Sequence, residues 1–264
     1  MFDLKSLTAI IDEYAPFNLS KIMIEKGDYD NSGILINSDQ KVDGVLFALD
    51  LTEDVVKRAK RLKCNTIVTH HPAIYHPISS VDITSATTGA VALALQNKMN
   101  VVSAHLNLDV ADLGVDYYLA EGLGATKVKI LDYVDQTHGY GREFTVQATT
   151  VKDFVSRIKK NFATEKVLVY GAKNAKVEKV ASFCGAGGSH AHSAVFSGAT
   201  DAEVIVTSDT PHHVIKDLVN ANKILIVITH YASENYGFKK FSESVRKKIN
   251  GLTQVHFFED KRLF

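Results

Sequence analysis

Short runs of apolar and β-branched residues alternate with segments of helical period along most of the chain, and this alternation restricts the fold more than any other feature. The expected strands cover residues 44–50, 65–69, 100–105, 166–171, 176–185, 201–208, 223–230 and 254–259. The expected helices cover residues 52–63, 85–98, 115–124, 150–162, 210–222 and about 233–250. A rhythm of this kind predicts an α/β fold with mainly parallel sheets.

Glycines and mixed polar residues break the rhythm between residues 132 and 145, and a similar rhythm starts after the break. The last helix and strand can return to the first half of the chain. We therefore expect two α/β domains. The first would comprise residues 1–134 and about 235–264, and the second residues 135–234.

The composition is that of an ordinary globular protein and favours no strongly charged partner. Hydrophobic residues make up 45% of the 264 residues and charged residues 23%, which is ordinary for a soluble globular protein with a substantial core. Thirty basic residues balance thirty acidic ones, so the net charge favours neither a nucleic-acid nor a membrane partner. The basic run Lys57–Lys63 follows two acids, an arrangement that suits a solvated helix with Thr52 as its N-cap.

Cysteine use and hydropathy point to the cytoplasm. The two cysteines, Cys64 and Cys184, lie far apart in the sequence and predict neither a disulfide framework nor a cysteine-rich zinc site. The first 17 residues contain acids and are typical of an amphipathic helix rather than a signal peptide. The apolar run Ile224–Ile228 is far shorter than a membrane span. We expect a soluble cytoplasmic protein without a membrane partner.

Three of the expected strands end in, or are followed directly by, polar side chains that can bind metals. These side chains are His70 and His71, His105 and Asp109, and His230 and Glu234. Because sites in open α/β sheets form at the carboxyl ends of strands, the three segments could meet in one cleft. Mixed nitrogen and oxygen ligands suit zinc, manganese, iron or similar ions.

Each segment alone also has a simpler interpretation. The pair His70 and His71, followed by proline, can be an incidental loop; the segment around Asp109 can begin a helix; a histidine four residues before an acid is common. Neighbouring side chains on a strand point to opposite faces, but at a strand end two histidines can splay toward two points. Two points could mean two metal ions, and a carboxylate such as Glu234 or Asp109 could bridge them.

Five segments together resemble the NGG-one-interacting factor three-like family, whose bacterial members carry the name GTP cyclohydrolase I type 2 homolog. They are "ALDLTEDVV...KCNTIVTHHPAIYHPI", "VVSAHLNLDVADLGVDYYLAEGLG", "CGAGGS", "VTSDTPHH" and "THYASE". "YDNSGILI" is also similar to the N-terminal aspartate-asparagine-glycine segment of the family. The resemblance covers essentially the whole chain.

The resemblance implies two α/β domains with a dinuclear metal centre in the cleft between them, in a ring-shaped homohexamer. The implied metal ligands are His70, His71, Asp109, His230 and Glu234. Each of the adjacent histidines would serve one metal, with a carboxylate shared. The two divalent ions would be Zn, Fe, Mn, Co or Ni.

Two departures from the family pattern concern the implied pocket wall. The last implied histidine follows "IVIT", where the family has a small or acidic lead that contains glycine. The family segment threonine-glycine-aspartate is Thr207-Ser208-Asp209 here. Neither departure removes a ligand. The resemblance also implies that His105 is a ligand or lies close to the metals.

Other polar residues have both a functional and a structural interpretation. The loop formed by Gly185, Gly187, Gly188 and Ser189 could bind a phosphate at a helix N-terminus, or it could be a tight turn. His213, near the start of a helix that Pro211 suits, could act as a general acid or base, as could His105.

Two further histidines, His190 and His192, are expected on the surface, although they could also contact substrate or metal. Cys184 is expected to be a small buried apolar residue.

Two classes of function fit these features. In the first, two cations about 3.5–4 Å apart activate a bridging water in a hydrolase-like protein. The resemblance implies a purine nucleotide such as GTP as substrate, and a phosphoester hydrolase would need the same centre. In the second, the protein is a metal-binding scaffold or a regulatory protein without turnover. The sequence leaves the metal, the substrate and the choice between these classes open.

Overall fold

The computed structural model describes residues 2–264, which form two compact α/β units. The first unit contains the chain up to Ala111 together with Phe238–Glu259, and the second contains Asp112–Gly237 and Asp260–Phe264. The segment from Asp112 to residue 134 groups with the second unit, because its strand pairs with the second sheet. The first boundary therefore lies earlier than the predicted position between residues 134 and 135.

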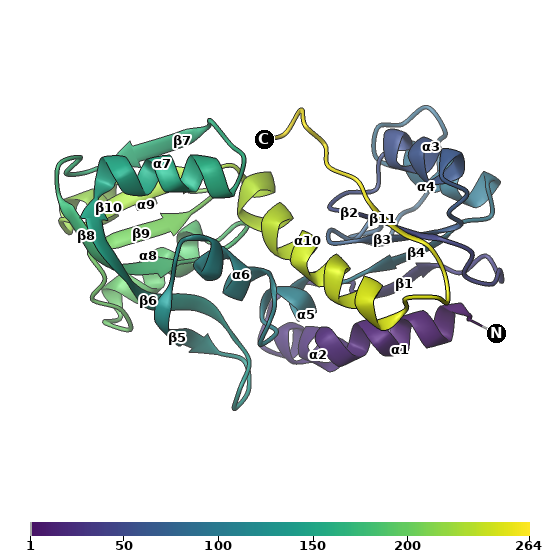
Figure 1. Ribbon diagram of the computed structural model, residues 1–264, viewed down its shortest axis with the longest axis horizontal. Coiled ribbons are helices and arrows are strands. Elements are labelled where there is room, and N and C mark those ends of the chain that lie inside the picture. Colours follow the sequence, from purple (N-terminus) through teal and green to yellow (C-terminus); the bar gives the residue numbers. More distant parts are fainter. Residues whose placement is uncertain (1) are drawn as a thin grey trace. The chain divides into compact units, whose positions relative to one another are not determined.

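The first unit is built on a five-stranded sheet with the strand order β1-β4-β3-β2-β11 (Figure 1). Its strands are β1 (Gly33–Ile36), β2 (Val45–Ala48), β3 (Thr66–Thr69), β4 (Asn100–Ser103) and β11 (Val255–Phe257). All neighbouring strands run parallel except β1, which pairs antiparallel with β4. The prediction of a mainly parallel sheet is confirmed for this unit.

Helices cover both faces of the first sheet. They are α1 (Leu4–Tyr14), α2 (Phe17–Glu25), α3 (Glu53–Arg61), α4 (Gly89–Gln96), α5 (Leu106–Asp109) and the later turns of α10 (His230–Lys248). Alternate residues of β2 point to opposite faces. Leu46 packs in a core with α3 and α4, whereas Phe47 contacts Phe238 and Phe241 of α10.

The second unit contains a six-stranded sheet with the order β5-β6-β8-β9-β10-β7. Its strands are β5 (Thr126–Tyr133), β6 (Gly139–Thr150), β7 (Val167–Tyr170), β8 (Lys176–Ser182), β9 (Val204–Thr207) and β10 (Ile224–Ile228). The three central strands β8, β9 and β10 run parallel, and the outer strands β6, β5 and β7 are added antiparallel. This sheet is therefore mixed around a parallel centre.

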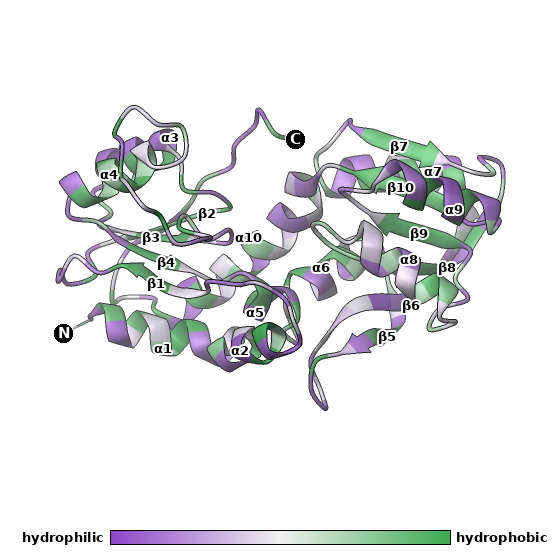
Figure 2. Ribbon diagram, turned by 180° about the vertical axis from the view of Figure 1, so that it is seen from behind, coloured by the Kyte–Doolittle hydropathy of each residue, from purple (hydrophilic) through white to green (hydrophobic). Residues whose placement is uncertain are grey.

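The helices of the second unit also cover both faces. They are α6 (Val115–Gly122), α7 (Val151–Asn161), α8 (Gly188–Phe196) and α9 (His212–Asn220), followed by the first turns of α10. α8 and α9 share a core with β9 and β10, and α6 and α7 pack on β6 and β8. Figure 2 shows the apolar strands of both sheets in green and the amphipathic helices in both colours.

The break in the sequence rhythm is a β-hairpin of β5 and β6, which the sequence did not predict as strands. Gly139 and Gly141 interrupt the alternation of apolar and polar residues by which a strand is recognised in a sequence. Close contacts with neighbouring atoms require glycine at both positions. A Cβ on Gly139 would lie 2.2 Å from the carbonyl oxygen of Asp132, and one on Gly141 would lie 2.4 Å from the Phe183 ring. Gly141 also has a positive φ of 72°, which glycine adopts at little cost.

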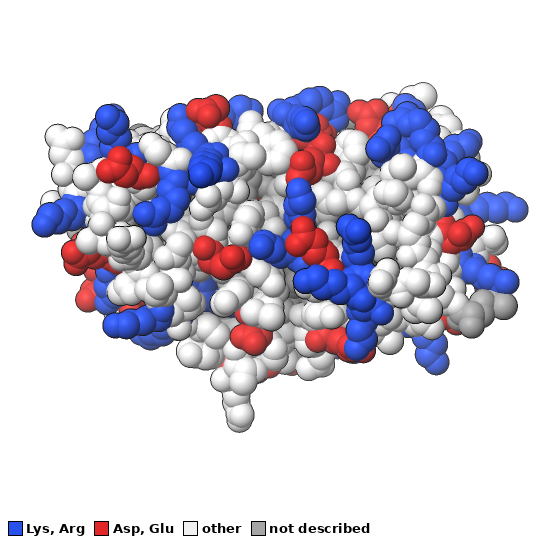
Figure 3. All heavy atoms as spheres, in the orientation of Figure 1, with Lys and Arg blue, Asp and Glu red and all other residues white. Residues whose placement is uncertain are grey.

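The N-cap of α3 and the distribution of surface charge agree with the predictions from the sequence. Thr52 caps α3 by accepting a hydrogen bond from Val55 N at 3.3 Å, and the basic residues of its last turn are exposed. In Figure 3, charges of both signs are interspersed over the face in view. No helix within residues 2–264 is long and apolar enough to cross a bilayer.

Candidate metal centre

The parallel strands β2, β3 and β4 of the first unit end at one edge of the sheet. Their last residues are in register, with Ala48 paired to Thr69 and Thr69 to Ser103. The polar segments that follow these strands are therefore brought together. Asp50 follows β2, the pair His70 and His71 follows β3, and His105 follows β4.

His70 is fully buried and held in one orientation. Its Nδ1 lies 2.7 Å from the carbonyl oxygen of Ala104, which can only accept a proton, so Nδ1 carries the hydrogen. Nε2 faces Asp109 Oδ1 at 3.3 Å. In a neutral imidazole both of these atoms are acceptors, and a proton or a cation is needed between them. The pair therefore has the chemistry of two ligands directed at one cation.

His71 turns toward a different neighbour. Its Nδ1 lies 2.7 Å from Asp50 Oδ1, on the loop after β2. A carboxylate in this position fixes the tautomer that leaves Nε2 to bind a metal. The rings of His70 and His71 are 5.0 Å apart and tilted by 44°, so the adjacent histidines do splay at the strand end.

His105 is oriented by a third oxygen. Its Nδ1 lies 2.8 Å from Oδ1 of Asp30, a buried carboxyl to which Ser32 Oγ also donates. Burial raises the pKa of Asp30, but hydrogen bonds from His105, Ser20 and Ser32 more than offset this, and the pKa lies below its ordinary value. Asp30 is therefore an ionised partner for His105 at neutral pH.

The three histidines of the first unit are oriented in the same way, through an oxygen at Nδ1. The His105 ring lies 5.3 Å from that of His70 and 5.7 Å from that of His71. Each Nδ1 is held by a carbonyl or carboxylate oxygen, so that Nε2 is the nitrogen that can bind a cation. Neither Asp30 nor Asp50 was predicted from the sequence to have a role. The available signal for Asp50 was an acid two residues after β2, the strand that pairs with β3 before His70.

The second unit contributes a histidine and a carboxylate on the first turns of α10. His230 Nε2 lies 3.0 Å from Glu234 Oε1, and His230 Nδ1 lies 2.6 Å from Oδ2 of Asp209, which follows β9. Because α10 begins at His230, earlier than the expected start near residue 233, the two donors share one helix face. Burial lowers the pKa of His230, but Glu234 and Asp209 raise it more, to about 9.

The glycine-rich loop lies against these two donors. Gly185 has a φ of 55°, and a Cβ there would lie 2.3 Å from Glu234 Oε1. Its N–H donates to Ser233 Oγ at 3.0 Å, and the N–H of Cys184 donates to Asp116 Oδ1 at 3.1 Å. The first part of the loop is therefore a tight turn whose backbone donors are engaged.

The serine that replaces the family glycine supports the same turn. Ser208 is buried, its hydroxyl donates to the carbonyl of Gly185, and it lies 3.2 Å from Ser233 Oγ. This departure from the family pattern therefore acts on the turn at Gly185, and no implied ligand is lost. Gly187 and Gly188 are buried at the start of α8, and Ser189 is exposed there.

The remaining sequence candidates lie on helix surfaces of the second unit. His213 is exposed in the first turn of α9. On α8, His190 is exposed and its ring meets the Tyr140 ring edge-to-face at 4.9 Å, while His192 lies 3.3 Å from Asp217. Cys184 is buried, as expected.

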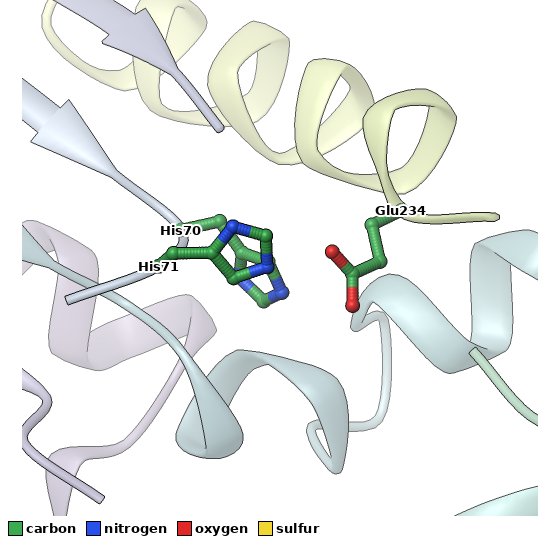
Figure 4. Close-up of side chains that lie close together, drawn as sticks. All are labelled: His70, His71 and Glu234. Carbon is green, nitrogen blue, oxygen red and sulfur yellow. The ribbon is translucent and has the colours of Figure 1, made fainter. Parts of the chain in front are cut away.

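Donor types on both units suit a divalent ion. Figure 4 draws His70 and His71, which follow β3 of the first unit, and Glu234, which lies on α10. Imidazole nitrogen with carboxylate oxygen is the donor set of zinc, iron and manganese sites. The residues present therefore fit such an ion in chemistry, while its identity and stoichiometry are open.

The sequence as a whole matches the model of a known family. The model of the family Duf34/NIF3 (NGG1p interacting factor 3) matches residues 2–262, and the chain belongs to this family. A GTP cyclohydrolase 1 type 2 homolog of Clostridium perfringens is 30% identical over 98% of this chain and 96% of the relative. One of Clostridium acetobutylicum is 30% identical over 87% and 84%.

Solved structures of related proteins have the same fold. A hypothetical protein of Staphylococcus aureus has a TM-score of 0.85 and 26% identity, covering 98% of this chain and 97% of that one. A Bacillus cereus protein related to NIF3 has a TM-score of 0.86 at 20% identity, covering 97% and 96%. The predicted family and the α/β fold with two sheets are both confirmed.

Proposed function

We propose that the protein binds two divalent metal ions and acts as a metal-dependent hydrolase on a nucleotide or a related substrate. The ligands would be His70, His71 and Asp109 of the first unit with His230 and Glu234 of the second. His70 and His71 would each serve one ion. The observation that carries the proposal is the shared design of the histidines after β3 and β4, whose Nδ1 atoms are held by oxygens.

Cations in such a centre supply Lewis acidity, which activates water for attack and stabilises negative charge on the substrate. The remaining functions fall to the chain itself. Asp30 holds His105 in one tautomer, with Nε2 directed away from the carboxylate, and we assign His105 as the group that accepts or donates a proton. His213 is a second candidate for this role, on the exposed start of α9.

We narrow the proposed phosphate contact to the later part of the glycine loop. The N–H groups of Cys184 and Gly185 already have side-chain acceptors. Gly187, Gly188 and Ser189 lie at the N-terminus of α8, where backbone donors and the helix dipole favour an anion.

Metal analysis tests the centre directly. Protein purified without chelator or nickel resin should carry about two metal equivalents, and both His71→Ala and Glu234→Ala should lower this number. His138→Ala is the matched control, because His138 also pairs with a carboxylate, Asp135 at 2.8 Å, but in the turn between β5 and β6. Metal content that is indifferent to His71→Ala and Glu234→Ala would refute the ligand set.

Turnover then separates the two classes of function. If His105→Ala keeps the metals and loses hydrolysis of GTP, the protein is an enzyme that uses His105. If the metal-loaded wild type hydrolyses neither GTP nor simple phosphoesters, the metal-binding scaffold is supported instead. The cytoplasmic location and the homohexamer stay predictions, and light scattering on the purified protein would test the latter.

A further inference from the structure

Three aromatic rings form an exposed cluster beside the histidines of the first unit. The rings of Tyr29 and Tyr75 are 5.0 Å apart, and that of His76 lies 4.3 Å from Tyr29 and 4.7 Å from Tyr75. Tyr29 is 43% exposed and Tyr75 38% exposed, although large aromatic side chains usually bury most of their surface. We call Tyr29, Tyr75 and His76 the aromatic platform.

The platform is held in place by hydrogen bonds rather than by burial. The Tyr75 hydroxyl donates to the carbonyl of Tyr29 at 2.7 Å. Asn31 Nδ2 donates to the carbonyl of Ile74 at 2.6 Å, which ties the same two segments a second time. A ring fixed in this way loses little further freedom when a ligand packs on it, so the platform is preorganised for binding.

The two segments that carry the platform also contain Asp30 and His71, which belong to the candidate metal centre. Tyr29 directly precedes Asp30, the partner of His105, and the Tyr75 ring stands perpendicular to that of His105 at 5.9 Å. His71 lies four residues before Tyr75. A ligand that lies on the platform therefore has its next group within reach of His105 and His71.

We infer that the aromatic platform stacks a planar heteroaromatic ring of the substrate and thereby places the bond to be attacked beside His105. This inference rests on the proposed function. Tyrosine and histidine faces stack such rings with little regard to their substituents. Burial raises the pKa of Tyr75, and the nearby negative charges of Asp30 and Asp28 raise it further. The platform therefore suits the ring of a nucleotide and disfavours its phosphates.

Paired substitutions at Tyr29 isolate the stacking contribution. Tyr29→Leu removes the ring and keeps an apolar side chain, whereas Tyr29→Phe keeps the ring. Calorimetry on the metal-loaded protein compares GTP with inorganic triphosphate, which has no ring. Wild type and Tyr29→Phe should prefer GTP, and Tyr29→Leu should weaken GTP binding about 5- to 100-fold while triphosphate binding stays unchanged.

A second pair of substitutions, at Tyr75, tests the same inference without changing Tyr29. Tyr75→Phe loses only the hydrogen bond to Tyr29, and Tyr75→Leu also loses the ring. The inference predicts a larger loss of GTP affinity in Tyr75→Leu. Thermal unfolding of each variant shows whether the fold is retained.

The outcomes distinguish this inference from the proposed function. If wild type binds GTP no better than triphosphate, or if both leucine variants keep the wild-type preference, the platform is refuted even when two metals are present. If the protein lacks metal but GTP affinity still falls in Tyr29→Leu, the platform stands and the proposed metal centre fails.

Discussion

The two sets of proposed metal ligands are built in opposite ways. In the first unit, the histidines follow different strands and are held by oxygens from distant parts of the chain, among them Asp30, Asp50 and Ala104. In the second unit, His230 and Glu234 lie one turn apart on α10. Helix geometry alone brings the second pair together, whereas the first set exists only because β2, β3 and β4 are paired in register.

The same difference appears in burial. The His70 side chain is fully inaccessible, and its ring also packs at 5.6 Å from Phe238. The His230 side chain is 32% exposed. His70 is therefore part of the core of its unit, and we expect it to support the fold as well as the proposed metal site. Substitution of His230 should affect metal binding with less effect on folding.

The largest expected effect separates His70 from His230. In chelator-treated protein, His70→Ala should lower the free energy of unfolding by about 2–4 kcal/mol, because it leaves a cavity and an unpaired carbonyl at Ala104. His230→Ala should cost less, about 1–2 kcal/mol, because the side chain is 32% exposed and leaves no closed cavity, while the buried Glu234 loses its partner at 3.0 Å. Urea denaturation measures both values. Equal losses in the two variants would remove the contrast between the units.

A smaller effect tests the oxygens that orient the first set. Asp30→Asn should cost about 1–3 kcal/mol, since the buried carboxylate accepts hydrogen bonds from His105 and Ser32. The folded-state pKa of Asp30 lies below its ordinary value of 3.8. Its contribution is therefore present in full above that value and is lost as the pH falls through the lowered folded-state pKa.

Denaturation of wild type and Asp30→Asn as a function of pH measures this contribution. The stability difference between them should be greatest at neutral pH and should shrink in acid. A difference that does not change with pH would show that the Asp30 charge is not what stabilises the network.

The smallest expected effect concerns Gly185, which lies against Glu234 in the second unit. Gly185→Ala and Gly198→Ala both place a side chain at positive φ, 55° and 77°, which should cost roughly 1–2 kcal/mol in each case. Only the Gly185 Cβ would collide with Glu234 Oε1; Gly198 has open space. Metal content should therefore fall in Gly185→Ala and stay at the wild-type level in Gly198→Ala. The same metal content in both variants would show that the loop does not position Glu234.

Strong local signals made much of the fold predictable. The cap at Thr52, the period of α3 and α7, and the apolar runs of the central strands are properties of short segments, and they occur where they were expected. The hairpin of β5 and β6 was not predicted. Its glycines are required by close contacts with Asp132 and Phe183, and such contacts cannot be read from the sequence.

The sequence by itself determined the family, the α/β class and the donors at the strand ends. Those features depend on residue type and on spacing along the chain, which a single sequence carries in full. Only the tertiary structure decided which nitrogen of each histidine is held, that Asp30 and Asp50 hold two of them, and that Gly185 lies against Glu234. These contacts join residues 21 to 75 positions apart, and only folding of the chain brings such residues together.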